Sequence, residues 1–196
     1  MLVLASICIP ARAASAESLS QTMQRCAPTI AVSTLDHVVT VESGWNPWAI
    51  HVNGTRQLAR QPVNREDAIR IAQWLLDQGH DIDLGLGQIN VRNLRRIHLT
   101  LADAFDACKN LSAAADLLST GLKLALSGGV QQPVLTALSY YNTGSPTLGF
   151  RNGYVDSVLK TRGATPIPLL PSVIPAFALD AFASDSNVGV YQSARR

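Results

Sequence analysis

Apolar side chains recur at intervals of three and four residues in the second half of the chain, and this periodicity is the strongest constraint on how the chain can fold. The most regular set comprises Leu111, Ala114, Ala115, Leu118, Leu122 and Ala125, and it ends at Ser127-Gly128-Gly129. This spacing places the apolar side chains on one face of a helix. The sequence therefore predicts a long amphipathic helix with its apolar face buried.

Similar patterns predict further helices. One follows the candidate N-caps Ser33 and Thr34, carries Leu35 and Val38 on one face, and ends at Gly44. The others are predicted at 64–78, 133–141 and 153–161.

The alternation of apolar and polar residues that marks strands is nearly absent. Only the segment 50–56, which contains an Asn53-Gly54 turn, predicts a small hairpin. The chain has 196 residues, of which 47% are hydrophobic and 15% are charged, so it can bury one core and is not disordered as a whole. We therefore expect a single all-α domain with at most one small hairpin.

The charge balance argues against two classes of partner. The 16 Lys and Arg residues nearly balance the 14 Asp and Glu residues, giving a formal net charge of +2. Such a chain has no strong electrostatic attraction to nucleic acid or to an anionic membrane. The charge-free apolar run 1–11 is shorter than the roughly 20 residues that cross a bilayer. We expect neither nucleic-acid binding nor stable membrane insertion.

The segment 1–16 has the composition of a secretory signal peptide. Its apolar stretch leads to two small-residue sites, Ala11-Arg12-Ala13 and Ala14-Ser15-Ala16, which are typical of signal-peptide cleavage. The basic residues that normally precede such a stretch are missing, so a frayed apolar end is the alternative. On the first interpretation, the folded domain begins at residue 17.

Removal of a signal peptide would leave two cysteines, Cys26 and Cys108. An even number of cysteines in a secreted protein favours a disulfide. Two buried free thiols are the alternative.

The segment 163–196 differs from the rest of the chain. It holds four of the ten prolines and shows no sustained periodicity, so we expect an extended tail outside a folded domain at 17–162. An apolar run at 169–182 is unusual for a solvated linker. A disordered terminus and a partner-binding segment therefore both remain open.

Several common catalytic and binding motifs are absent from the sequence. The four histidines are scattered, and none belongs to a His-Glu-x-x-His motif. Neither a Gly-x-Ser-x-Gly elbow nor a Gly-rich phosphate loop occurs. We expect no metal and no cofactor.

Glu42 lies on the apolar stripe of its predicted helix, one turn after Val38, and precedes a loop that contains Trp45 and Trp48. Partial burial disfavours an ionised carboxylate and raises its pKa, which keeps a proton available for general acid catalysis near neutral pH. A helix-end carboxylate bonded to neighbouring amides would fit the same pattern. Spacing alone leaves both interpretations open.

Three motifs occur in order: Glu42-Ser43 with Asn46-Pro47-x-Ala49-Ile50, then Gly85-Leu86-Gly87-Gln88-Ile89-Asn90, then Tyr141-Asn142-Thr143-Gly144. Over about 26–159, the chain resembles the lysozyme-like lytic transglycosylases. The segments 105–111 and 149–155 are similar to the branch of that family that serves type IV secretion and conjugation machines.

This resemblance implies a small lysozyme-like domain in the periplasm that cuts the β-1,4 bond between N-acetylmuramic acid (MurNAc) and N-acetylglucosamine (GlcNAc) in peptidoglycan. Glu42 would be the sole acid and base. It would protonate the leaving oxygen and then take the proton of the muramic 6-hydroxyl, which closes a 1,6-anhydro ring. The usual second carboxylate then becomes unnecessary. The tail could contact components of the secretion system.

The resemblance also assigns roles to other residues. Ser43 would orient Glu42; Gly85, Gly87 and Gln88 would line the sugar cleft; Tyr141 and Asn142 would hydrogen-bond Glu42 or the substrate; and Tyr154 matches a later cleft tyrosine. On pattern alone, Tyr141 could be a core residue, Gln88 a loop amide and the glycines turn formers. Gly87 departs from the wider family, which carries Met at this place.

Two other functions fit the same residues. A goose-type lysozyme would share the fold and Glu42 but would use water, with Asp81 or Asp83 as a second carboxylate. A glycan-binding or scaffolding module would instead dock on peptidoglycan or on a secretion complex, and the apolar tail is its best support. The combination of Glu42, Gln88 and Tyr141-Asn142 favours the enzyme.

Overall fold

The computed structural model describes residues 18–54, 57–161 and 167. The predicted signal peptide 1–16 lies outside these residues, and so does the predicted tail 163–196 apart from Ile167. Ile167 belongs to the hydrophobic core, with 7% of its surface exposed. The core therefore includes a residue beyond 162. In the part of the chain that the structure describes, every helix is too short or too polar to cross a bilayer.

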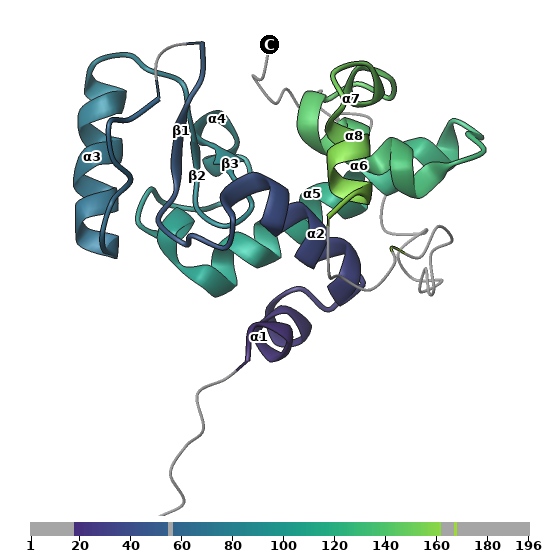
Figure 1. The fold of residues 1–196 in the computed structure, drawn as a ribbon, viewed down its shortest axis with the longest axis horizontal. Helices are drawn as coiled ribbons and strands as arrows, with labels where there is room; N and C mark the ends of the chain where they lie inside the picture. Colours follow the sequence, from purple (N-terminus) through teal and green to yellow (C-terminus); the bar gives the residue numbers. More distant parts are fainter. Residues whose placement is uncertain (1–17, 55–56, 162–166, 168–196) are drawn as a thin grey trace, which may run out of the picture.

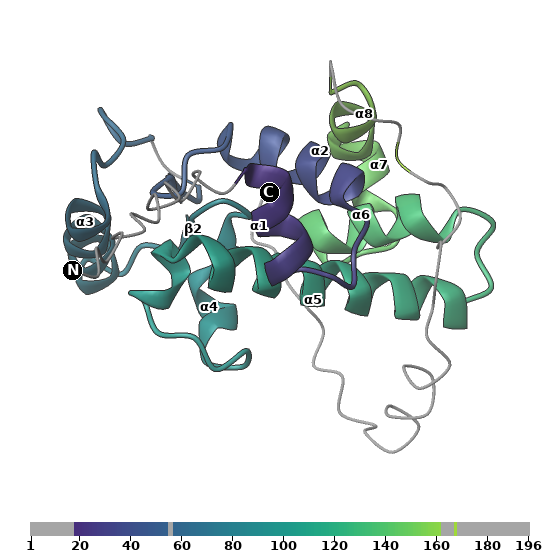
Figure 2. The ribbon, with the colours of Figure 1, turned by 90° about the horizontal axis from the view of Figure 1, so that it is seen from below.

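The predicted long helix is α5 (Ala107–Ser127), and it begins earlier than its apolar pattern because Asp106 caps it by accepting the N–H of Lys109 at 2.9 Å. The helix α6 (Pro133–Thr143) runs beside α5 (Figure 2). Gly121 permits this close contact, since a Cβ there would lie 3.0 Å from the Cβ of Tyr140. Among the described elements, these two helices make the most extensive contact with each other.

The other predicted helices are also present, as α2 (Val32–Ser43), α3 (Arg65–Asp77) and α8 (Tyr154–Leu159). The prediction of Ser33 or Thr34 as the N-cap of α2 was wrong: the cap is Ala31, which makes no side-chain bond. Val32 packs against the core, and the helix therefore starts before the polar residues. Four further elements were not predicted, namely α1 (Leu19–Cys26), α4 (Val91–Leu94), α7 (Leu148–Arg151) and the 3-10 helix η1 (Asp103–Phe105).

A three-stranded antiparallel sheet replaces the single hairpin that the sequence predicted. The strands are β1 (Ile50–Val52), β2 (Ile82–Leu84) and β3 (Ile89–Asn90), in the order β1-β2-β3. The hairpin expected within 50–56 was wrong in its pairing, because β1 pairs with β2 and not with the residues after Asn53-Gly54. Strands of two or three residues are too short to display alternation, and their partners are set by tertiary contacts.

The sheet has one apolar and one polar face. Ile50, Leu84 and Ile89 are aligned across the strands and are almost fully buried. Asp83 is paired with His51 on one side and with Asn90 on the other. Figure 1 shows this sheet and α3 on one side of the molecule and α6, α7 and α8 on the other, with α2 between them. The all-α class with a small β component is thus confirmed.

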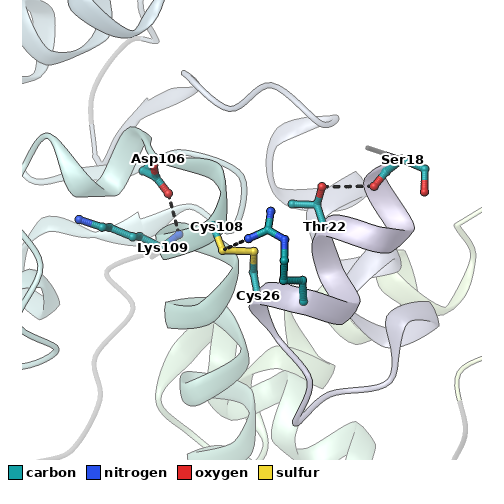
Figure 3. The surroundings of a disulfide bond; sticks show 7 residues. Ser18, Thr22, Cys26, Asp106, Cys108 and Lys109 are labelled. Carbon is teal, nitrogen blue, oxygen red and sulfur yellow. Dashed lines mark hydrogen bonds between the residues drawn. A yellow bond between two sulfur atoms is a disulfide. The ribbon is translucent and has the colours of Figure 1, made fainter. Parts of the chain in front are cut away.

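A disulfide joins Cys26 at the end of α1 to Cys108 in the first turn of α5 (Figure 3). The pairing predicted from the sequence is therefore present in the structure. The two residues are 82 positions apart, and their Cα atoms lie 5.1 Å apart. Since the bridge closes a long loop, its main effect is to reduce the conformational entropy of the unfolded chain.

We expect the double variant Cys26→Ala/Cys108→Ala to fold but to lose about 4 kcal/mol of unfolding free energy, because the unfolded chain regains the entropy of an open loop. Urea unfolding followed by circular dichroism measures this difference. Adding reductant should lower the stability of the wild type and leave that of the variant unchanged. Equal stability of oxidised and reduced wild type would contradict the prediction.

Candidate active site

Glu42 lies in the last turn of α2 and is half-buried. The helix ends at Gly44, which has a left-handed backbone with φ of +56°, and Trp45 follows with φ of +68°. A tryptophan rarely adopts this conformation, and the strain is offset in part by its indole Nε1, which donates to Thr40 Oγ1 at 3.1 Å. Two successive left-handed residues turn the chain sharply away from the helix, directly after Glu42.

Tyr154 is distant from Glu42 in the sequence but contacts it in the folded chain. Its hydroxyl donates a hydrogen bond to Oε1 of Glu42 at 2.7 Å, between residues 112 positions apart. Tyr154 is the first residue of α8 and is 6% exposed. A hydroxyl that donates to a carboxylate makes one of the stronger protein hydrogen bonds and fixes the orientation of the acid.

Asn142 and Tyr154 are linked through Asn152. The side-chain Nδ2 of Asn152 donates to Asn142 Oδ1 at 2.8 Å, and its Oδ1 accepts the backbone N–H of Tyr154 at 3.0 Å. Sequence reasoning gave Asn152 no role. The only signal was its place in the segment 149–155.

The loop 85–88 connects β2 to β3 and depends on two glycines. Gly85 has φ of +72°, and a Cβ there would lie 2.4 Å from both Ala104 O and Asn110 Nδ2. The side chain of Asn110 also accepts the N–H of Gly87 at 2.7 Å. Asn110 lies in the segment 105–111, which resembles a branch of the family, but nothing in the sequence pointed to this contact.

Tyr141 lies against the same loop. Its hydroxyl donates to the carbonyl oxygen of Gly87 at 2.5 Å. A Cβ at position 87 would lie 2.8 Å from this hydroxyl and 2.8 Å from Ala114 Cβ. A Met at position 87 would therefore require Tyr141 or Ala114 to move, which fits the glycine found here.

Gln88 closes the loop onto the start of the sheet. Its Nε2 donates to Gly85 O at 2.8 Å and to Ala49 O at 3.2 Å, and its backbone is left-handed with φ of +49°. Ser43 is half-buried and donates to Val39 O, one turn earlier in α2, at 3.2 Å. The predicted roles of Gln88 as a sugar ligand and of Ser43 as an orienting residue stay predictions.

The two aspartates that could serve a hydrolase as its second carboxylate are both bonded to Asn90 of β3. Asp83 is 2% exposed, and its Oδ1 accepts from Asn90 Nδ2 at 2.8 Å. The same amide donates to Asp81 at 2.9 Å, and Arg92 pairs with Asp81 at 3.3 Å. Both carboxylates thus stabilise the sheet and the start of α4. Among the described residues, no cluster of three His, Cys, Asp or Glu could hold a metal ion.

Comparison with known proteins gives consistent matches. Residues 20–161 match the family described as "Transglycosylase SLT domain". The chain is 39% identical over 160 residues to the "Type IV secretion system protein virB1" of Brucella suis biovar 1, covering 76% of this chain and 67% of the relative. It is 37% identical over 161 residues to the "Protein virB1" of Rhizobium radiobacter, covering 80% of this chain and 65% of the relative.

The chain thus spans about two thirds of the length of these relatives. No solved structure matches it significantly. The family match covers most of the chain and includes Glu42, the loop 85–88, Tyr141 and Tyr154. The chain therefore belongs to the transglycosylase SLT domain family and, within it, is similar to the VirB1 proteins of type IV secretion systems.

Proposed function

We propose that the protein is a lytic transglycosylase that cleaves the MurNAc-GlcNAc β-1,4 bond of peptidoglycan and forms 1,6-anhydro-MurNAc, with Glu42 as its only acid and base. The observation that carries this proposal is the hydrogen bond from Tyr154 to the half-buried Glu42. Membership of the SLT family supplies the reaction class. The reaction replaces the C1–O4 bond of one substrate by a C1–O6 bond, with proton transfers through Glu42, and needs no cofactor.

The Tyr154 hydroxyl supports both halves of the proposed reaction. Because it donates to Oε1, it favours the transferable proton on Oε2 of neutral Glu42. Glu42 gives this proton to the O4 of the leaving GlcNAc as the glycosidic bond breaks. The muramic O6 bonds to C1, and its proton returns to the carboxylate, which Tyr154 stabilises in the interval. No water is consumed, and Glu42 regains its starting state.

The biological setting follows from the relatives. The name of the Brucella suis relative places that protein in a type IV secretion system, and the family is one of transglycosylases. We propose that this chain opens peptidoglycan locally in the periplasm for such an apparatus. Contact with the apparatus through the tail is part of this proposal.

The goose-type hydrolase remains the main alternative chemistry. It requires a second carboxylate that activates water, usually about 6.5–9.5 Å from the acid in inverting enzymes. Asp81 and Asp83 are instead bonded to Asn90, and Asp81 also pairs with Arg92. These contacts favour a structural role for both aspartates and therefore favour the transglycosylase.

The first experiment compares Glu42→Gln with the wild type on purified peptidoglycan. The amide has nearly the same shape but cannot donate or reclaim the proton, so we expect release of anhydro-muropeptides to fall at least about 1,000-fold, the upper part of the range for general acid–base catalysis. Glu66→Gln, on the exposed surface of α3, is the matched control and should retain full activity. Mass analysis of the products makes the measurement. Reducing ends in the wild-type digest would support the hydrolase.

The second experiment tests the two aspartates. We expect Asp81→Asn and Asp83→Asn to retain most of the lytic activity, because an amide can still bond to Asn90 and no step of the proposed reaction uses either carboxylate. Thermal unfolding should show a modest loss of stability for both. An inactive Asp83→Asn variant with a normal melting curve would shift the assignment to a hydrolase.

The third experiment separates an enzyme from a docking module. A chain that ends after Pro168 removes most of the tail but keeps the buried Ile167. We expect this truncated chain to digest purified peptidoglycan at the wild-type rate, because the catalytic groups all precede residue 160. Loss of digestion in a truncated chain that still unfolds cooperatively would favour the docking alternative.

A further inference from the structure

Asn152 occupies the turn between α7 and α8 and is exposed to solvent. Its side-chain amide uses both of its polar atoms. Nδ2 donates to Asn142 Oδ1 at 2.8 Å, and Oδ1 accepts the N–H of Tyr154 at 3.0 Å. Because an amide has one donor end and one acceptor end, these two bonds fix its orientation.

Tyr154 depends on this amide for its backbone position. It is the first residue of α8, where the N–H groups have no acceptor within the helix. The preceding Gly153 has φ of +79° and provides no side chain to cap the helix. Asn152 supplies the missing acceptor. It thereby restrains the backbone of Tyr154, from which the ring extends toward Glu42.

The opposite end of α8 is held separately. His37 of α2 contacts the carbonyl oxygen of Val158 through Nδ1 at 2.8 Å. The bond between Tyr154 and Glu42 is thus accompanied by a second polar contact between α8 and α2. If the contact of Asn152 were lost, His37 would still attach α8, but the end that carries Tyr154 would have fewer restraints.

Asn142 connects this turn to α6. It lies next to Tyr141 and is 3% exposed, so its side chain provides a buried, well-fixed anchor. Asn142 is hydrogen-bonded to the side chain of Asn152, which is bonded to the backbone N–H of Tyr154. The side chain of Tyr154 in turn bonds to Glu42 through its hydroxyl. The Tyr-Asn motif of α6 is therefore coupled to the acid through the α7–α8 turn.

We propose that Asn152 is a positioning residue for the transglycosylase reaction, which holds the Tyr154 hydroxyl on Glu42. The inference rests on the proposed function, since it assigns Asn152 a part in that reaction. Asn152 does not touch the reacting atoms. Its effect passes through the backbone of Tyr154 and should therefore vanish when the Tyr154 hydroxyl is absent.

A double-mutant cycle with Asn152→Ala and Tyr154→Phe tests this coupling. The readout is the rate of anhydro-muropeptide release at saturating and at limiting peptidoglycan. In the wild-type background, Asn152→Ala should lower kcat about 3- to 10-fold, as expected for one or two neutral hydrogen bonds, and leave KM nearly unchanged. In the Tyr154→Phe background, the same substitution should lower kcat less than about 1.5-fold, because the hydroxyl that Asn152 would position is absent.

The controls separate positioning from stability. Asn152 is exposed, so its truncation leaves no cavity in the core. Should Asn152→Ala nevertheless melt below the assay temperature, Asn152→Leu, which is similar in size and also lacks both polar atoms of the amide, takes its place and is judged by the same criterion. Ser157→Ala, on the exposed face of α8, removes a local hydrogen bond and should keep wild-type kcat in both backgrounds.

Equal losses of kcat in both backgrounds, or no loss in the wild-type background, would overturn the role of Asn152. A different result would refute the proposed function, namely that the wild type itself releases no anhydro-muropeptides. Wild-type release of these products together with an additive cycle would refute only the positioning role.

Discussion

The buried amide of Asn110 is the contact on which the geometry of this fold depends. It stands in the first turn of α5, is 1% exposed, and pairs with three backbone groups: Gly87 N–H at 2.7 Å, Leu84 O at 2.9 Å and Ala104 O at 2.8 Å. Buried backbone groups must be paired, and the loop 85–88 cannot satisfy all of its own. One side chain of the central helix therefore fixes the end of β2, the following loop and η1 in a single arrangement.

The glycines of the loop follow from this contact. Asn110 and Ala104 come so close to Gly85 that a Cβ would overlap with both. Gly87 is crowded by Ala114 and by the hydroxyl of Tyr141, which bonds to its carbonyl oxygen. The absence of a side chain at position 87 therefore makes room for the hydroxyl of Tyr141. The bond from Tyr141 connects α6 to the loop 85–88 and, through this loop, to the sheet.

Glu42 is held by elements that meet only in the folded state. The left-handed pair Gly44 and Trp45 ends α2 just after it, and Tyr154 approaches from α8. Tyr154 is in turn fixed by Asn152, which is bonded to Asn142 of α6. The acidic groups of the sheet are occupied by Asn90 and Arg92. Among these described carboxyl groups, Glu42 is the one that we propose for proton transfer, and the arrangement is consistent with chemistry that needs one carboxylate.

The sequence by itself determined the helices with a clear apolar period, the stop signals at Gly44 and Gly128, and the disulfide between Cys26 and Cys108, and its family motif led to the proposal of Glu42 as the acid. These features are local patterns or follow from residue type, and local patterns survive without knowledge of the partner. Only the tertiary structure decided that β1 pairs with β2, that Tyr154 is a direct partner of Glu42, and that Asn110 and Asn152 hold the loop and the tyrosine in place. The strands are too short to show a period. The polar contacts of Tyr154 and Asn110 join residues 112 and 23 positions apart, so they cannot be predicted from a local sequence pattern. Their partners are chosen by the need to pair buried polar groups once the helices have packed.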